Sequence, residues 1–160
     1  MRTLNIENRA DIEKIIDKCK TCYLAMSANG MPYVLPMNFA LDGNNVVLHS
    51  AQSGRLWDTI LKNPRVCINW TLGEELAWQN ERVGCSYRIK SKSVIVEGEA
   101  TIVSNYDEKY RLLHVFMKHY SDGDFNFNRP SVENVGIIRV AIEKISAKEF
   151  GAKAETPWRS

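Results

Sequence analysis

The chain has 160 residues, a length that suits a single domain with one hydrophobic core. Its 21 Lys and Arg residues nearly balance 19 Asp and Glu residues, so nothing in the composition indicates a nucleic-acid-binding protein. The longest apolar runs are too short to span a membrane, and residues 1–9 lack the apolar core of a signal peptide, so we expect a cytoplasmic protein.

The first twenty residues predict an amphipathic helix. Asn8 is a good N-cap residue, and apolar side chains follow it at the i, i+3, i+4, i+7 spacing of one helix face (Ile12, Ile15, Ile16 and Cys19). We therefore expect residues 1–20 to form an N-terminal helix that packs one face on the body of the domain.

Three strands joined by two tight turns are predicted next. Residues 21–28 alternate between two faces, and Asn29-Gly30 reverses the chain into residues 32–41. Asp42-Gly43 then reverses it into residues 46–50. The expected arrangement is an up-and-down meander.

The bend after the third strand has features of an anion site. Ala51-Gln-Ser-Gly-Arg55 is small and polar with one cation, and a periodic segment to Asn63 predicts a helix that begins at Arg55. Backbone N–H groups at a helix N-terminus and a guanidinium both attract anions. An N-cap role for Ser53 and a solvated first-turn role for Arg55 explain the same residues, and the pattern leaves both interpretations open.

The segment from residue 65 to residue 104 predicts two strands and a long connection. Residues 65–70 and 87–104 are rich in strand-forming residues, and Gly98 indicates a bend in the second strand. Residues 71–84 are polar and acidic, which predicts either a lid over a site or an Ω-loop closed on Trp78.

The last third predicts one helix and one strand. Asn105 begins a helix with a buried stripe (Tyr110, Leu113, Phe116, Met117 and Tyr120), and residues 121–133 are expected to form a loop. A strand over residues 135–145 and a polar tail over residues 146–160 complete the chain. Several strands with three helices and no βαβ alternation predict one antiparallel barrel domain with helices packed outside.

The four cysteines offer one motif, Cys19-Lys-Thr-Cys22. Cys67 and Cys85 have no close His or Cys, so no second ligand pair completes a zinc site. The motif follows a helix, whereas a reactive dithiol is stabilised at a helix N-terminus. We expect reduced cysteines packed as small apolar residues, with a zinc or redox protein as the weakest alternative.

No sequence pattern of a hydrolase or a nucleotide-binding loop is present. The chain lacks G-x-S-x-G, a Walker loop and G-x-G-x-x-G, and its histidines (His49, His114 and His119) have no Asp or Glu at metal-ligand spacing. No metal site is therefore expected, and any redox chemistry would have to come from a cofactor.

Four segments resemble the pyridoxamine 5′-phosphate oxidase-like flavin-binding split barrels, and within them the nitroimidazole-resistance (Nim) proteins. They are PYVLPMNF (32–39), LHSAQSGR (48–55), KNPRVC (62–67) and SVIVEGEA (93–100), in the family's order and spacing. The resemblance implies a mainly β fold: a six-stranded antiparallel Greek-key split β-barrel with peripheral helices. It also implies a homodimer with a flavin, usually FMN, at the interface.

The resemblance assigns residues to the flavin. It places the strand Pro36-Met37-Asn38-Phe39 along the isoalloxazine edge, and His49 and Ser50 near the ring and the ribityl chain. Ser53-Gly54-Arg55 match the phosphate-binding turn. Lys92-Ser93 match a position that often reaches the flavin of the other subunit.

The sequence departs from the family pattern at two places, one of which bears on the expected cofactor and the other on the expected activity. Many relatives carry a second cation directly after the residue that matches Arg55, but here that residue is Leu56. One cation fewer leaves room for FAD, whose diphosphate spreads its charge. Trp158-Arg159 do not match the C-terminal Trp and Arg that true pyridoxamine phosphate oxidases use, so we do not expect that activity.

The expected function is a flavin-dependent reductase of the Nim type, acting on nitro-aromatic or other small oxidised molecules. His49 would donate a proton or a hydrogen bond to the substrate, although a packing role explains it equally well. The alternative is a non-catalytic flavin-binding module acting as a redox sensor, a store or a drug scavenger, because binding and catalysis use nearly the same residues. Expected partners are a flavin, a small electron acceptor and a second copy of the chain, without nucleic acid or membrane.

Overall fold

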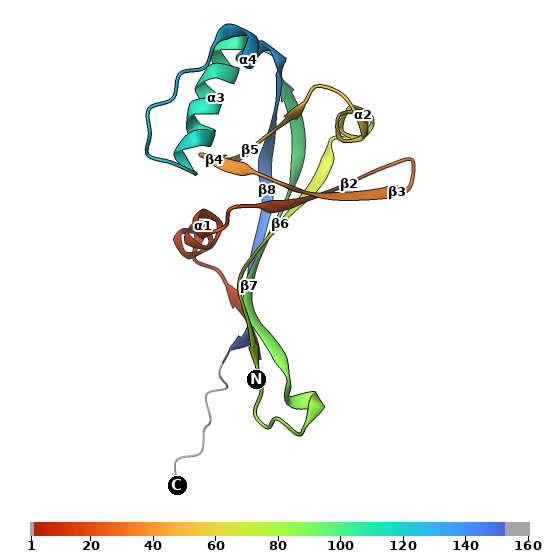
Figure 1. Cartoon of the computed structure of the whole chain (residues 1–160). Helices are drawn as coiled ribbons and strands as arrows, with labels where there is room; N and C mark the ends of the chain where they lie inside the picture. Colours follow the sequence, from red (N-terminus) through yellow and green to blue (C-terminus); the bar gives the residue numbers. More distant parts are fainter. Residues whose placement is uncertain (1, 153–160) are drawn as a thin grey trace. The chain divides into compact units, whose positions relative to one another are not determined.

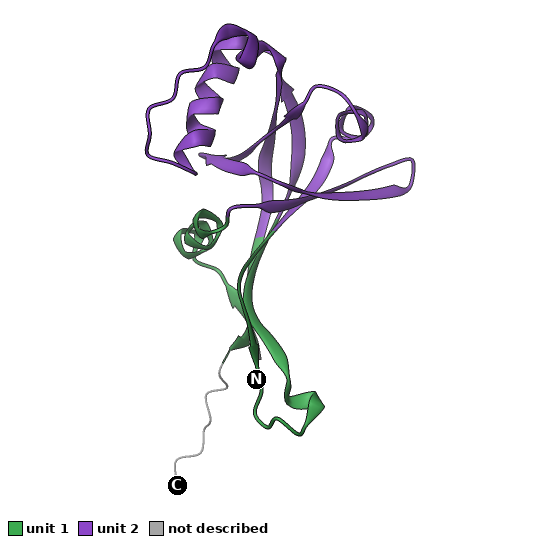
Figure 2. Cartoon of the chain, viewed as in Figure 1, with its two compact units in different colours: residues 1–19, 70–95, 146–160 green, residues 20–69, 96–145 purple. Residues whose placement is uncertain are grey.

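The structure is a computed structural model that describes residues 2–152. Within this range the chain forms eight β-strands, four α-helices and one short 3-10 helix (Figure 1). It divides into two compact units (Figure 2). We call residues 20–69 and 96–145 the barrel unit, and residues 1–19, 70–95 and 146–160 the terminal unit.

The barrel unit is an antiparallel sheet closed on itself. Its strands are β2 (Cys22–Ala28), β3 (Met31–Met37), β4 (Phe39–Asp42), β5 (Asn45–Ala51) and parts of β6 (Arg65–Ala77), β7 (Arg88–Val103) and β8 (Val135–Ala152). The strand order is β3-β2-β6-β7-β8-β5-β4, so β3 and β4 stand at opposite ends. Because Asn38 alone separates these two strands in sequence, the chain itself joins the two ends of the sheet.

This closure corrects the expected meander. Both predicted hairpins exist: Asn29 and Gly30 have φ of 53° and 75°, and Gly43 has φ of 59°. However, residues 31–37 pair only with β2 and residues 39–42 only with β5. The predicted strand 32–41 is therefore two strands, because the chain leaves one end of the sheet at Asn38 and enters the other.

The core of the barrel unit follows from strand alternation. Cys22, Leu24 and Met26 of β2 are buried while Tyr23 between them is half exposed. Large side chains from five other strands fill the interior (Phe39, Leu48, Ile68, Val96 and Ile138). A Cβ at Gly98 would collide with the backbone carbonyl of Ala141, so the glycine allows β7 and β8 to approach closely.

Three helices cover the barrel unit. They are α2 (Arg55–Lys62), α3 (Tyr106–Lys118) and α4 (Arg129–Asn134). The stripe of α3 buries Leu112, Leu113 and Phe116 against Val132 and Ile137. Asn105 caps α3 through the N–H of Glu108, as predicted. The loop predicted over residues 121–133 is wrong at its end, where Asn128 and a first-turn proline begin α4.

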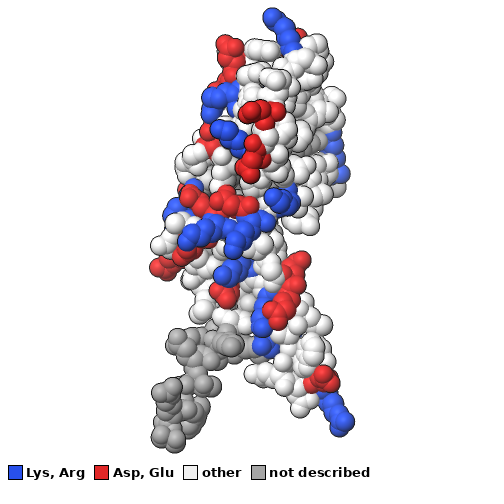
Figure 3. Space-filling model, turned by 60° about the vertical axis from the view of Figure 1, so that its left-hand side comes forward, with Lys and Arg blue, Asp and Glu red and all other residues white. Residues whose placement is uncertain are grey.

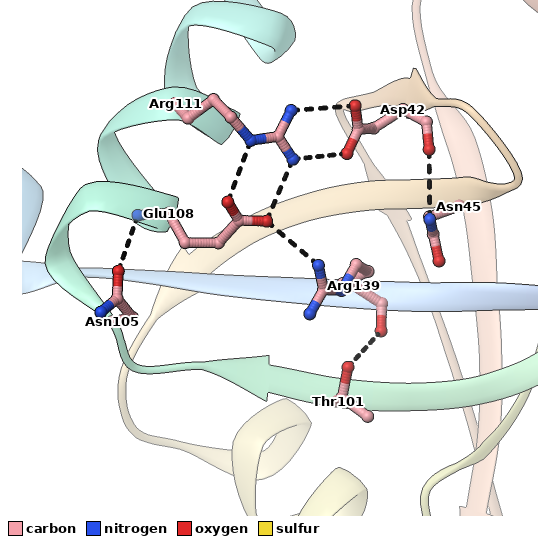
Figure 4. A network of polar contacts seen from close by, with 7 residues as sticks. All are labelled: Asp42, Asn45, Thr101, Asn105, Glu108, Arg111 and Arg139. Carbon is pink, nitrogen blue, oxygen red and sulfur yellow. Dashed lines mark hydrogen bonds and ion pairs between the residues drawn. The ribbon is translucent and has the colours of Figure 1, made fainter.

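An ion-pair network fastens α3 to the strands (Figure 4). Arg111 lies 2.7 Å from the Asp42 carboxylate at the end of β4 and 2.9 Å from Glu108 one turn earlier in α3. Glu108 also lies 3.1 Å from Arg139 of β8. Hydrogen bonds from Arg111 lower the pKa of both carboxyl groups.

The terminal unit contains β1 (Arg2–Ile6), α1 (Arg9–Lys18) and the 3-10 helix η1 (Gly84–Ser86), with the remaining parts of β6, β7 and β8. Asn8 caps α1, as predicted. The helix predicted over residues 1–20 is wrong for residues 2–6, which form β1 because they pair with residues 147–152 of β8. The polar tail predicted over residues 146–160 is therefore wrong for residues 146–152, because pairing with β1 extends β8. Residues 153–160, including Trp158 and Arg159, lie outside the described residues.

The lid or Ω-loop predicted over residues 71–84 is also wrong for residues 71–77, where β6 continues. Pairing with neighbouring β7 outweighs the polar composition, and Lys90 of β7 lies 3.1 Å from Glu75 of β6. Trp78 just beyond the strand stacks on Tyr87, with ring centroids 5.4 Å apart.

The predicted fold class is confirmed: the chain is mainly β, antiparallel and flanked by helices, with eight strands in the described range where six were expected. None of the helices between residues 2 and 152 is long and apolar enough to cross a membrane. On the face drawn in Figure 3, basic and acidic side chains are interspersed, in keeping with the small net charge of +2.

Candidate functional site

The N-terminus of α2 is built to leave backbone N–H groups available. Gly54 is the N-cap residue, with φ of 95°, and no side chain caps the helix. The left-handed φ favours glycine, and a Cβ there would meet nothing within 4 Å, so the turn is open to solvent. The alternative N-cap role of Ser53 is therefore wrong, whereas the anion-site interpretation retains its donors.

Arg55 is held in place by the hairpin of β2 and β3. Its guanidinium carbon lies 4.1 Å from the ring centroid of Tyr33, and Nη2 donates a 3.3 Å hydrogen bond to the carbonyl of Pro32. Stacking and a fixed acceptor orient the guanidinium while most of its donors stay unused. Tyr33 is a positioning residue that sequence reasoning missed, because no local pattern links it to Arg55.

A groove of about 340 Å³ lies beside this helix. Arg55 and Lys62 bring two cations to it and Asp58 brings one acid, while Ala28, Asn29 and Met31 supply the hairpin wall. Many relatives carry a second cation at the position of Leu56, which is buried in this chain. Lys62 is the cation of the groove that could supply this charge instead.

The junction between β3 and β4 presents a fixed backbone. The Asn38 amide donates to the carbonyl of Lys20 at 3.3 Å. Tyr120 at the end of α3 donates to the same carbonyl at 3.0 Å and accepts from the N–H of Phe39 at 2.8 Å. Tyr120 is a second positioning residue that sequence reasoning missed, because its helical spacing indicated only packing.

The side chains of residues 36–39, the strand predicted to lie along the flavin edge, differ in how far they are buried. The side chains of Met37 and Phe39 are buried at 8% and 0% exposure, while Pro36 and Asn38 are exposed. A ligand at this edge would therefore meet the backbone and the side chains of Pro36 and Asn38. Pro36 pairs in register with Tyr23, and β3 is an end strand of the sheet.

His49 lies on β5, paired with Ile137 of β8. Its ring meets the Phe116 ring edge-on, with centroids 4.6 Å apart. Nδ1 is buried and has no hydrogen-bond partner among the described residues. Burial lowers the pKa of His49, which favours the neutral imidazole. Ser50 next to it donates its hydroxyl to the carbonyl of Ala51 at 2.7 Å.

Lys92 and Ser93 lie on β7 in the terminal unit, whereas the other predicted site residues belong to the barrel unit. Lys92 Nζ lies 3.7 Å from the Glu149 carboxylate of β8. Their assignment to the flavin stays a prediction.

None of the cysteines in the described chain forms a disulfide bond. Cys19 and Cys22 are buried, and burial raises the pKa of the Cys19 thiol. No group of three or more His, Cys, Asp or Glu side chains among residues 2–152 is arranged to hold a metal ion.

Comparison with known proteins identifies the family to which the chain is similar. Residues 8–149 match the pyridoxamine 5′-phosphate oxidase family. A candidate 5-nitroimidazole antibiotic resistance protein from Bacteroides thetaiotaomicron has 32% sequence identity and a TM-score of 0.83 over 92% of this chain and 87% of that one. No curated protein matches the sequence.

Two more distant structures share the fold. The flavocytochrome Anf3 from Azotobacter vinelandii has 21% identity and a TM-score of 0.80, covering 98% of this chain and 72% of that one. An FAD- and haem-binding protein from Mycobacterium smegmatis has 14% identity and a TM-score of 0.84, covering 95% and 76%. Because the family match spans most of the sequence, the chain belongs to the pyridoxamine 5′-phosphate oxidase family.

Proposed function

We propose that this protein binds a flavin and acts as a reductase of nitro-aromatic or other small oxidised molecules. The observation that carries the proposal is the open N-terminus of α2, where Gly54 leaves backbone donors uncapped beside the stacked guanidinium of Arg55. Such a turn suits a phosphate group. The 32% identity to a candidate nitroimidazole-resistance protein supports the choice of substrate class.

The residues present fit a flavin. Ser53, Gly54 and Arg55 would hold its phosphate, and the backbone around Asn38 would meet the polar edge of its ring. The buried Nδ1 of His49 has no hydrogen-bond partner among residues 2–152, which is costly unless a ligand supplies one. We propose FMN as the cofactor, with FAD as the alternative that the single phosphate-turn cation allows.

Held by these residues, a flavin would supply the redox chemistry that links a reduced donor to an oxidised acceptor. The chain's own contribution is positioning and hydrogen bonding. Because burial favours neutral His49, its single N–H would act as a hydrogen-bond donor toward an acceptor oxygen that gains negative charge. The chain would also pair as a homodimer, since the outward face of β2 and β3 carries exposed Tyr23 and Val34.

Flavin binding is tested with Arg55→Ala. Losing one charge-assisted hydrogen bond should weaken flavin binding about tenfold or more while the unfolding midpoint stays unchanged. Fluorescence titration of flavin-free protein measures the affinity, and heat release followed by chromatography distinguishes FMN from FAD. Lys118→Ala, which removes an exposed cation from α3, is the matched control. Equal affinities in the two variants would contradict the phosphate assignment.

Turnover is tested with His49→Gln. Flavin-loaded protein, chemically reduced, is mixed with a nitroimidazole in a stopped-flow instrument, and free reduced flavin is the reference. We expect the wild type to reoxidise faster than free flavin and the variant to slow about tenfold with its flavin retained. A wild type no faster than free flavin would leave a flavin-binding module without catalysis. A variant as fast as the wild type would return His49 to a packing role.

A further inference from the structure

None of the residues assigned to the flavin lines a second cavity of the barrel unit, which has a volume of about 200 Å³. Its walls come from the end of β7, the start of α3 and the junction of α4 with β8. Gln52 and Trp57 complete the lining. The volume is below the roughly 300–1,000 Å³ of pockets for drug-sized ligands, so the cavity suits a smaller molecule.

A buried ammonium group lines this cavity. Lys109 of α3 is only 6% exposed, and its Nζ donates one hydrogen bond of 2.9 Å, to the backbone carbonyl of Glu133 at the end of α4. This hydrogen bond caps the C-terminal end of α4 and uses one of the three N–H donors of the ammonium. No carboxylate among residues 2–152 lies within ion-pair distance of Lys109 Nζ.

The nearby acid does not neutralise Lys109. The Glu133 carboxylate is bound by Arg129, 2.7 Å away, and its side chain is 49% exposed. Burial lowers the pKa of Lys109, and the attraction of Glu133 opposes this effect only as the smaller contribution. A buried cation with spare donors is costly, and an anion in the cavity would offset that cost.

The other walls combine apolar and polar side chains. Trp57, Ile102, Val103 and Val135 supply the apolar part, and Gly136 lets the Trp57 ring lie directly against β8. A Cβ at Gly136 would come within 2.6 Å of that ring. The polar part comes from Gln52, Ser104, Tyr106 and Glu133. One cation beside an apolar wall fits a singly charged group on an apolar body, whereas a phosphate needs several converging donors.

We propose that this cavity binds a small monocarboxylate, with its carboxylate on Lys109 Nζ and its apolar body against Trp57. The inference goes beyond the proposed reductase, because it uses no residue assigned to the flavin. It defines a second ligand site on the same barrel unit.

The test uses benzoate as the probe and the full chain as purified. The Trp57 indole N–H resonance, assigned by comparison with Trp57→Phe, is followed by NMR during titration. We expect a saturable shift with benzoate and an affinity about tenfold or more lower for uncharged benzamide, because the charged hydrogen bond is lost. The same loss is expected for benzoate and Lys109→Met, while Lys118→Met on the same helix binds as the wild type does.

Several results would overturn the proposal. These are equal affinities for benzoate and benzamide, no saturable shift, or a Lys109→Met variant that binds benzoate normally. Saturation by inorganic phosphate but not by benzoate would also contradict it. Displacement of benzoate by FMN would assign the cavity to the flavin site.

Should Lys109→Met fail to fold, the benzoate and benzamide titrations of the wild type still test the proposal. Loss of flavin binding in Arg55→Ala with benzoate binding intact would separate the two proposals.

Discussion

Tyr120 joins two parts of the barrel unit through one hydroxyl group. It accepts from the N–H of Phe39 and donates to the carbonyl of Lys20, which the Asn38 amide also reaches, so loss of the hydroxyl removes two hydrogen bonds but leaves that carbonyl one partner. We expect Tyr120→Phe to lower the free energy of unfolding by about 0.5–1.5 kcal/mol, the usual net contribution of a hydrogen bond. Urea denaturation followed by circular dichroism measures this change.

Tyr110→Phe is the matched control for that experiment. Tyr110 lies on the same helix, and its hydroxyl makes no hydrogen bond to the described residues. If both tyrosine variants were equally stable, the hydroxyl of Tyr120 would have no positioning role.

At the level of single residues, the sequence predicts the side chains that form hydrogen bonds with residues close to them in the chain. Asn8 and Asn105 were identified as helix caps because each bonds an N–H two or three positions away. Tyr33 and Tyr120 were missed because their partners are brought to them only by the folded barrel. The site residues found by resemblance, such as Arg55 and Asn38, therefore depend on supports that no local pattern predicts.

Arg111 connects the helix α3 to the β4–β5 turn and, through Glu108, to β8 (Figure 4). Because these groups are partly exposed, we expect Arg111→Met to lower the free energy of unfolding by only about 1 kcal/mol at pH 7. Arg129→Met removes a more exposed pair with Glu133 within α4 and a 5.5 Å contact with the Tyr106 ring, and should cost less. A larger effect of Arg129→Met in urea denaturation would contradict this ranking.

The same network predicts a pH dependence. Asp42 and Glu108 have lowered pKa values in the folded chain, chiefly because Arg111 donates hydrogen bonds to them. Their contribution is complete above the ordinary carboxyl pKa of about 4 and is lost as the pH falls below it. The stability difference between wild type and Arg111→Met should therefore shrink below about pH 4.

Elements were predicted well where the chain's own periodicity decides them and poorly where partner strands do. α1 and α3 begin where their caps and apolar stripes indicate. The ends of β6 and β8 were missed because β7 and β1 extend them by pairing. The division at Asn38 was missed because strand propensity continues through that residue although the pairing partner changes.

At the scale of the whole molecule, the outward face of β2 and β3 bears on the proposed homodimer. Tyr23 and Val34 on this face are 49% and 60% exposed. We expect light scattering to give a mass twice the 18.3 kDa of one chain, and Val34→Lys to shift it toward the monomer. Leu61→Lys, another exposed apolar position, is the control. A wild-type monomer would contradict the dimer.

The pairing of β5 with β8 has a consequence for the newly made chain. His49 on β5 pairs with Ile137 on β8. The strand β5 therefore has β4 as a partner but lacks β8 until residues 135–145 have been synthesised. Synthesis at about 5–20 residues per second then gives a delay of several seconds between the two strands. We expect a ribosome-bound fragment that ends before Val135 not to bind the proposed flavin, although it carries every barrel-unit residue assigned to it, because β5 still lacks its pairing with β8.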